Sequence, residues 1–283
     1  MNIQEVLQQL DTFFRNNEIE KVEPFLLDHL EGARKHRDVS TELTVLNELM
    51  GFYRGMGRHR EAIAHSVDAL GLLEDHGYKG SVPYATTLLN AATAYRADDQ
   101  NIRANQAYEE VAAIYRAQKM EDPYLWASLY NNQSLAWQGC GRHERAIACL
   151  ELALPLIASR PGSEADQAVT LTNLAQSKMR SGRIDEAAAD LDRAIALFEH
   201  QTPRNPHYGA ALSARGELAF RQNDVAAAIR HFEQALAAIE TNYGRSHNYA
   251  VTLESLATVL EASDATRAAS LREEAARIEA TLA

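Results

Sequence analysis

One sequence motif occurs four times in the 283-residue chain, and it restricts the possible folds more than any other feature. It reads GRHREAIAHSVDAL at residues 57–70 and GRHERAIACLELAL at residues 141–154, and related copies occupy 182–195 and 223–236. Each copy begins with a turn residue and has Ala five positions later. Self-similarity at a fixed period is the signature of a repeat architecture.

The period is set by a small residue that lies twelve positions before the recurring Ala. Successive small residues are 41 or 42 residues apart, and the larger Leu10 and Met50 continue the series upstream. We therefore predict a single solenoid domain over residues 1–283, made of seven units. The small residues are Ala92, Ser134, Ala175, Gly216 and Ala257, the recurring alanines are Ala62, Ala104, Ala146, Ala187, Ala228 and Ala269, and the units span approximately 1–37, 38–79, 80–121, 122–163, 164–204, 205–245 and 246–283.

Each unit is predicted to be two helices joined by a short turn. Apolar residues recur within the units at three- and four-residue steps, which is helical periodicity. Small side chains let neighbouring helices approach closely, and stacking of successive pairs buries the apolar face that one pair leaves exposed. The prediction is an all-α solenoid of about seven antiparallel helix pairs. The turns are marked by residues that tolerate a left-handed backbone, namely Gly57, Asp99, Gly141, Gly182, Asn223 and Asp264.

The charge and the composition argue against several classes of protein. A net charge of −11 repels a phosphate backbone and an anionic membrane surface, so we expect neither nucleic acid nor membrane as a partner. No apolar run is long enough to span a bilayer, and the start of the chain, MNIQEVLQQLDTFF, lacks the features of a secretory signal. These features predict a cytoplasmic protein. The two cysteines, Cys140 and Cys149, have neither metal-binding nor redox spacing.

The repeat resembles the tetratricopeptide repeat family, whose pattern has a small residue at position 8 of the unit, an aromatic residue at 11 and Ala at 20 and 27. Tyr53, Tyr95 and Trp137 match position 11. The units here have 41 or 42 residues rather than the usual number of about 34, and this longer form is similar to the kinesin light chain type of repeat. The resemblance implies a right-handed superhelix, or α-solenoid, whose first helices line a concave groove with positions 2, 5, 6, 9, 12 and 13.

Asparagines recur at two of these groove positions. Position 6 holds Asn90, Asn132 and Asn173, and position 5 holds Asn47 and Asn131. Because an amide both donates and accepts hydrogen bonds, a ladder of asparagines can pair with the backbone of an extended peptide. The resemblance implies this binding role. The alternative is that these asparagines only solvate a helix face.

A second ladder lies further along the first helices. Its members, Arg54, Arg96, Gln138, Arg180 and Arg221, are spaced 41 or 42 residues apart. If these side chains converge, they form a basic seam suited to carboxylates or phosphates. The alternative is that the helix dipole favours arginine in the last turn of a helix whatever the function. Both ladders are candidate ligand-binding residues.

The sequence contains no catalytic motif, metal-ligand spacing or cofactor fingerprint, so we expect neither an enzyme nor a cofactor. The hypothesis that fits best is a protein–protein interaction scaffold that binds a peptide or a partner-protein segment, including an acidic one, in the groove. Two alternatives stay open. One is a peptide-responsive regulatory or signalling receptor domain that acts through another protein, and the other is a module that self-assembles through its terminal units.

Overall fold

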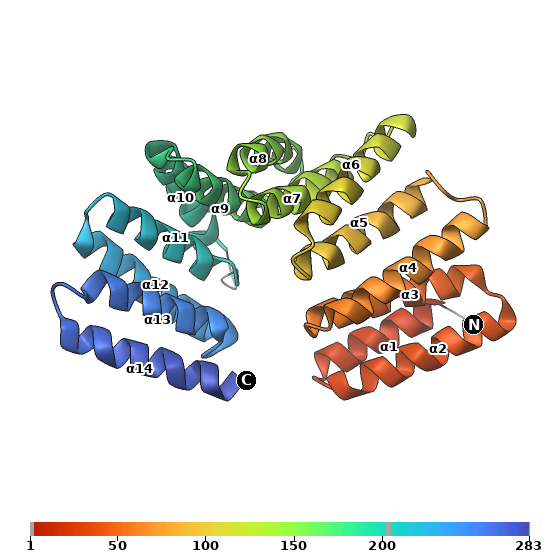
Figure 1. Cartoon of the computed structure of the whole chain (residues 1–283), viewed down its shortest axis with the longest axis horizontal. Coiled ribbons are helices and arrows are strands. Elements are labelled where there is room, and N and C mark those ends of the chain that lie inside the picture. The colour runs from red at the N-terminus through yellow and green to blue at the C-terminus, as the bar shows by residue number, and fades with distance from the viewer. Residues whose placement is uncertain (1–2, 202–204, 283) are drawn as a thin grey trace. The chain divides into compact units, whose positions relative to one another are not determined.

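A computed structural model describes residues 3–201 and 205–282 of the chain, and every regular element in that part is a helix (Figure 1). The predicted all-α class is therefore confirmed. The predicted unit ends at residues 1, 204 and 283 lie outside the described residues. The elements are α1 (Ile3–Arg15), the short 3-10 helix η1 (Ile19–Lys21), α2 (Val22–His36), α3 (Val39–Gly55), α4 (His59–Asp75), α5 (Val82–Ala97), α6 (Asn101–Ala117), α7 (Pro123–Gly139), α8 (His143–Ala158), α9 (Glu164–Arg180), α10 (Ile184–Glu199), α11 (Tyr208–Arg221), α12 (Val225–Tyr243), α13 (His247–Leu260) and α14 (Ala265–Leu282).

The helices pack in sequential antiparallel pairs, and within each body the second helix of a pair also packs on the first helix of the next, as in α2 on α3, α4 on α5, α8 on α9, α10 on α11 and α12 on α13. The first helix of each pair is α1, α3, α5, α7, α9, α11 or α13. The chain divides into two compact bodies, to which α7 contributes one part each. We call residues 1–122 and 135–141 the N-terminal body, and residues 123–134 and 142–283 the C-terminal body. The assignment of all seven pairs to one continuous domain stays a prediction.

The turns inside the pairs mostly adopt the left-handed conformation that the sequence predicts. Gly57 and Gly182 have φ values of 71° and 79°, and the non-glycine residues Asp99 and Asn223 have φ values of 57° and 67°. A residue with this backbone conformation ends the first helix and redirects the chain into the second. The short spacing between paired helices therefore follows from these residue types.

The predicted small residues lie at the crossings between helices. Ala92, Ala175 and Ala257 are completely buried. At Gly216, an added Cβ would lie 3.0 Å from the ring of Phe232 on α12, so the ring occupies the space that a side chain would need. Close packing of helix pairs thus depends on the absence of bulk at one recurring position.

The last helix departs from the predicted register by one residue. The sequence placed the recurring Ala of the seventh unit at Ala269, but Ala269 is exposed and Ala268 is buried. The reason is that Asp264 does not act as the left-handed turn residue. Its carboxylate accepts the backbone N–H of Arg267 at 3.0 Å and so caps α14. Because the buried Ala follows the capping residue by four positions in the other pairs as well, α14 presents Ala268.

Candidate functional site

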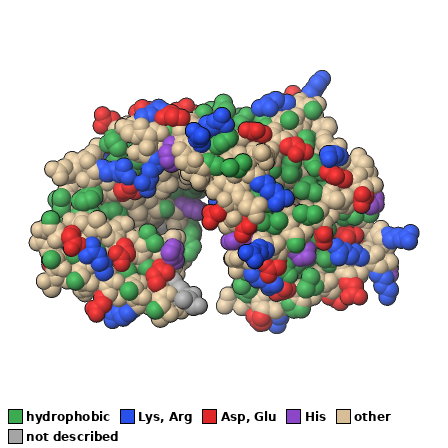
Figure 2. Space-filling model, in the orientation of Figure 1, with side chains coloured by type: hydrophobic (Ala, Val, Ile, Leu, Met, Phe, Trp, Pro, Cys, Tyr) green, Lys and Arg blue, Asp and Glu red, His purple; other side chains and the backbone are tan. Residues whose placement is uncertain are grey.

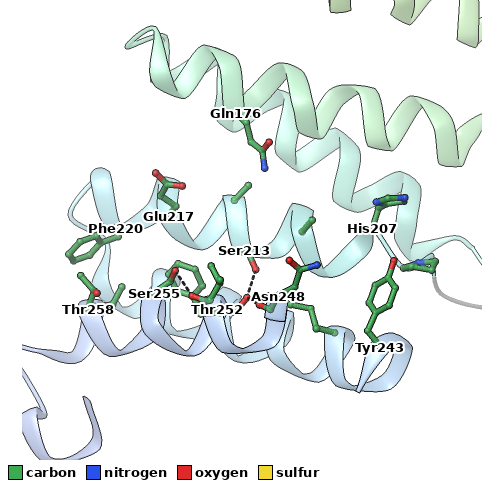
Figure 3. Close-up of a pocket in the computed structure, with 17 residues that line it drawn as sticks. Gln176, His207, Ser213, Glu217, Phe220, Tyr243, Asn248, Thr252, Ser255 and Thr258 are labelled. Carbon is green, nitrogen blue, oxygen red and sulfur yellow. Dashed lines mark hydrogen bonds between the residues drawn. The ribbon is translucent and has the colours of Figure 1, made fainter. Parts of the chain in front are cut away.

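The C-terminal body contains a cleft of about 530 Å³ on the face formed by its last three first helices, α9, α11 and α13 (Figure 3). Helix α12 supplies its deep wall through Phe232 and Ile239. A volume of this size lies within the range of sites that bind small molecules or peptide side chains. The cleft is the candidate site that the geometry favours most.

Helical spacing places the α11 residues of the cleft on one stripe. The lining residues recur at steps of three and four, which puts them on the same side of the helix. They correspond to groove positions 2, 5, 6, 9 and 12 of the sixth unit. The first three are small, so they leave the hollow that larger side chains would fill. These residues are Ala210, Ser213, Ala214, Glu217 and Phe220.

Exposed apolar side chains border this cleft. Phe220 on α11, Tyr243 at the end of α12 and Val251 on α13 keep 40%, 50% and 49% of their surface exposed. Large hydrophobic residues scattered singly over a surface carry no meaning, but a group of them around a cleft marks an interaction site. The three side chains can therefore cover an apolar group bound in the cleft.

The polar groups of the cleft are mostly uncharged. The hydroxyls of Ser213 and Thr252 are 3.3 Å apart and link α11 to α13. The amides of Gln176 on α9 and Asn248 on α13 lie at its edge, with Ser255 between Asn248 and the far end of α13 (Figure 3). Hydroxyls and amides both donate and accept hydrogen bonds, which suits the backbone of an extended chain.

Glu217 is the one Asp, Glu, Lys or Arg among the described residues that line the cleft, and two arginines neutralise it. Its Oε1 atom lies 2.6 Å from Nη2 of Arg221 and 3.9 Å from Nη2 of Arg180. All three side chains are partly exposed, so the ion pairs contribute little to stability. They do, however, give two members of the predicted basic seam an acidic partner, and the single carboxylate offsets one of their two positive charges.

The predicted asparagines of the N-terminal body bind each other. Asn90 on α5 donates through Nδ2 to Oδ1 of Asn47 on α3, at 3.0 Å. Asn47 in turn donates to the backbone oxygen of Leu43 at 3.0 Å and to the Thr87 hydroxyl at 3.4 Å. The Asn47 amide therefore serves the stacking of neighbouring repeats.

The asparagines of the C-terminal body lie on α7 and α9, and none of them lines the cleft. Asn131 accepts a hydrogen bond from the Thr170 hydroxyl at 3.2 Å, which links α7 to α9. Asn132 donates to the backbone oxygen of Ser128 at 2.9 Å. Asn173 is half-buried on α9. The ladder thus holds first helices together at two interfaces, and its role in ligand binding stays a prediction.

The arginines of the N-terminal body differ from those near the cleft. Arg54 is exposed near the end of α3, and Arg96 is half-buried near the end of α5. Within the described residues neither forms an ion pair, and Nε of Arg96 is buried without a hydrogen-bond partner. Gln138, the third member of the series, is half-buried near the end of α7. The arginines near the cleft therefore share one acidic partner, Glu217, whereas Arg54 and Arg96 have no ion-pair partner among the described residues.

Sequence reasoning missed the cleft because it followed the polar ladders. At position 12 the sixth unit has Phe220 where the second and third units have arginine, and at position 6 it has Ala214 where three other units have asparagine. These two departures from the ladders were the available signal. Phe220 gives the cleft an aromatic wall, and Ala214 leaves space because its side chain is small. Together the two residues make the cleft apolar.

The remaining groups give no sign of metal or thiol chemistry. No cluster of three His, Cys, Asp or Glu residues that could hold a metal occurs in the part of the chain that the structure describes. Burial raises the pKa of the Cys149 thiol to about 11, so this thiol stays protonated. None of the described helices has the length and apolar character needed to cross a membrane.

The chain is similar in fold to several solved helical-repeat proteins. BtubC from P. vanneervenii is 22% identical with a TM-score of 0.62, over 78% of this chain and 90% of BtubC. A kinesin light chain-like protein of Podosopora anserina with nearly identical repeats is 20% identical with a TM-score of 0.59, over 71% and 96% of the two chains. NprR in complex with its cognate peptide NprX is 15% identical with a TM-score of 0.65, over 98% and 78%. No curated protein matches the sequence significantly.

The fold defines an all-α helical-repeat protein with a cleft on the face of three first helices. Two tetratricopeptide repeat models match the sequence, one at residues 127–200 and the other at residues 172–243. Residues 127–243 of the chain therefore consist of tetratricopeptide repeats. This scaffold generally serves protein–protein interaction and is typically non-enzymatic.

Proposed function

We propose that this protein is an interaction module that binds an extended segment of a partner protein in the cleft between α9, α11 and α13. The observation that carries the proposal is the coincidence of the hollow with groove positions of consecutive repeats, bordered by Phe220, Tyr243 and Val251. Repeat scaffolds bind along faces that successive units share. NprR, whose peptide complex has a similar fold, supports a peptide as the kind of ligand.

The lining chemistry supports a neutral segment with one apolar anchor. Glu217 is already paired with two arginines, so a charged partner residue gains little there. An aromatic or aliphatic side chain that moves from water into the cleft would gain about 1.5–3 kcal/mol. Backbone hydrogen bonds to the amides of Gln176 and Asn248 would fix its direction.

The test is a selection of peptides from a random displayed library against the full chain. The decisive variant is Ala210→Trp, which fills the cleft from the exposed side of α11. The matched control is Ala226→Trp on the exposed side of α12, where no described cleft residue lies. Selected peptides should carry apolar residues and lose about tenfold in affinity with Ala210→Trp alone, as the loss of one apolar anchor requires. A selection without binders, or binders that ignore Ala210→Trp, would overturn the proposal.

The asparagine ladder is part of the same proposal as a second row of contacts. Asn132 and Asn173 lie on α7 and α9, the first helices that precede α11 in the C-terminal body. A segment longer than the cleft would run from the cleft toward them. Asn132→Ala should then weaken long selected peptides and leave short ones unaffected.

A second candidate function is a peptide-responsive regulatory domain, which the likeness to NprR with its cognate peptide favours. A regulatory domain must change its interaction with an effector protein when the peptide binds. Hydrogen exchange of the full chain with and without a selected peptide tests this function. Protection confined to α9, α11 and α13 indicates a passive binding module, whereas changes in helices that do not line the cleft indicate a switch.

A further inference from the structure

A second cleft, of about 420 Å³, lies in the N-terminal body among α1, η1, α2 and α3. Its floor includes the buried side chains of Leu10, Val22 and Leu26. Phe14 on α1 and Met56 after α3 line it and keep 49% and 51% of their surface exposed. Like the first cleft, it combines an apolar floor with exposed apolar walls.

Glycines open this second cleft on the α3 side. Gly51 and Gly55 lie about one helical turn apart, and a Cβ added at either would meet nothing within 4 Å. The space above them is therefore free to receive an apolar group. We call this space the N-terminal hollow.

The polar groups of the two clefts differ. The first cleft is lined by hydroxyls and amides, such as those of Ser213, Thr252 and Gln176, whereas no side-chain hydroxyl or amide lines the second in the part of the chain that the structure describes. Its charged side chains are Glu48 and Arg54 of α3. A peptide backbone that entered the second cleft would lose hydrogen bonds to water without replacement, which is costly. The lining therefore favours a small molecule that has no peptide backbone, and the volume lies within the range of small-molecule sites.

Glu48 indicates the charge that such a ligand carries. It stands at groove position 6, where three other units have asparagine. Its side chain is half-buried, and within the described residues its carboxylate accepts no hydrogen bond and forms no ion pair. Burial, and then the charge of Asp11, raise the pKa of Glu48 above its usual value, as expected of a carboxylate whose charge the protein does not offset. A cation bound beside it would supply the missing partner.

Arg54 does not impose the opposite preference. It is exposed, so water solvates its guanidinium group, whereas Glu48 is partly withdrawn from water. Arg54 lies about 9 Å further along the axis of α3 and about 120° around the helix from Glu48. The aromatic walls also favour a cation, since the rings of Phe14 and Phe52 attract positive charge over their faces.

We propose that the N-terminal body binds a small organic amine, whose ammonium group pairs with the Glu48 carboxylate and whose aryl or alkyl body fills the N-terminal hollow between Phe14 and Met56. Charge complementarity at Glu48 and the apolar lining select this class of ligand. The site lies in the other body from the proposed peptide cleft and does not depend on it.

Isothermal titration calorimetry of the full chain tests this site with three matched probes. Phenylbutylamine carries the ammonium group and the aryl body, phenylbutanol has a hydroxyl in place of the ammonium, and phenylbutyrate has a carboxylate. The amine should bind about tenfold more tightly than the alcohol, as a charge-assisted hydrogen bond to a half-buried carboxylate requires, and phenylbutyrate should bind most weakly. No binding of the amine, equal binding of the amine and the alcohol, or tighter binding of phenylbutyrate would overturn the proposal.

Two pairs of variants locate the binding. Glu48→Gln should lower the affinity for phenylbutylamine about tenfold and leave that for phenylbutanol unchanged, whereas Glu109→Gln on the exposed side of α6 should change neither. Gly51→Leu should weaken both probes by filling the hollow, whereas Gly71→Leu on the exposed side of α4 should weaken neither. A Cβ added at either glycine meets open space, so both leucine variants should fold. Binding that survives both Glu48→Gln and Gly51→Leu would contradict the proposed site.

Two further measurements separate this site from the first cleft and from a protein ligand. Ala210→Trp should have no effect on phenylbutylamine, so failure here and failure of the first cleft are distinguishable. A peptide that contains Lys-Phe between Gly-Ser flanks should bind more weakly than phenylbutylamine, because its backbone finds no hydroxyl or amide side chain among the described residues of the cleft. Tighter binding of the peptide would assign the cleft to a partner protein and overturn the proposal.

Discussion

The two bodies of this protein use the same repeat but differ at position 9 of the first helix. In the N-terminal body that position holds Gly51, which leaves a hollow beside an unpaired Arg54. In the sixth unit, in the C-terminal body, it holds Glu217, whose one carboxylate pairs with Arg221 and lies near Arg180 and so offsets part of their charge beside the adjoining cleft. The side chain at position 9 thus decides whether the arginine beside an apolar cleft is unpaired, as Arg54 is, or paired with a carboxylate, as Arg221 is. The scaffold is common to both, and the charge selectivity is local.

The comparison is sharpest where the two bodies pack the helices of a pair differently. In the N-terminal body, Tyr53 on α3 stacks on His65 on α4 with ring centroids 5.3 Å apart. At the equivalent positions of the C-terminal body, Lys178 on α9 pairs with Asp190 on α10 at 2.7 Å, and both are only 7% exposed. Lys178→Ala should lower the free energy of unfolding by about 3–5 kcal/mol, because the buried carboxylate of Asp190 keeps only the distant guanidinium of Arg193, 4.0 Å away, as a cationic partner among the described residues. Urea denaturation measures it.

A transplant supplies the control for that prediction. The double variant Lys178→Tyr with Asp190→His installs the residue pair of the N-terminal body in the C-terminal body. It should recover most of the stability that Lys178→Ala loses, since a stacked pair of neutral rings fills the space of the ion pair and leaves no buried charge unpaired. A double variant as unstable as Lys178→Ala would show that the two pairs are not interchangeable.

Two glycines on first helices should respond to alanine in opposite ways. Gly209 on α11 is buried, and an added Cβ would lie 2.6 Å from Cγ1 of Ile239, so Gly209→Ala should cost about 1–3 kcal/mol through overpacking. Gly51 on α3 faces open space, and Gly51→Ala should stabilise the protein by about 1 kcal/mol, because glycine disfavours a helix interior. Thermal denaturation of both variants gives the two signs. Destabilisation by Gly51→Ala would show that the N-terminal hollow is not open.

Much of this fold could be predicted from the sequence, because a helix or turn that is ambiguous in one repeat is supported by the equivalent residues of the others. Seven copies of one pattern fixed the helix type, the turn residues such as Gly57 and the buried small residues such as Ala175. The register of α14 could not be predicted, since capping by Asp264 replaces a turn residue that looks the same in sequence. The partners of Asn47 and Arg180 could not be predicted either, because they lie on neighbouring repeats about forty residues away.

The charge difference between the bodies can be reversed at Glu217. Glu217→Gln should free Arg180 and Arg221, and the C-terminal cleft should then bind a selected peptide that carries a glutamate beside its apolar residue a few fold more tightly, as a charge-assisted hydrogen bond requires. The stability should change by less than about 1 kcal/mol, because the broken pairs are partly exposed. Anisotropy titration of this peptide against the wild type and the Glu217→Gln variant measures the gain. An unchanged affinity would mean that the arginines do not reach the cleft.

The smallest expected effect is one that the two bodies share. Burial lowers the pKa of His65 on α4 and of His231 on α12 below the usual value of 6.5. The charge of Arg34 lowers the pKa of His65 further, and the charge of Arg215 lowers that of His231. Asp68 and Glu61 near His65, and Asp192 near His231, oppose the shift only in part.

Because both imidazoles prefer the neutral form when folded, the unfolded chain binds more protons below pH 6.5. The stability present above pH 6.5 should therefore be lost as the pH falls through the lower pKa values of the folded state. Denaturation midpoints from pH 8 to pH 5, compared among the wild type, His65→Gln and His231→Gln, measure each share. If the single variants keep the full pH dependence, the loss belongs to other groups, and burial of these two rings does not govern the acid response of either body.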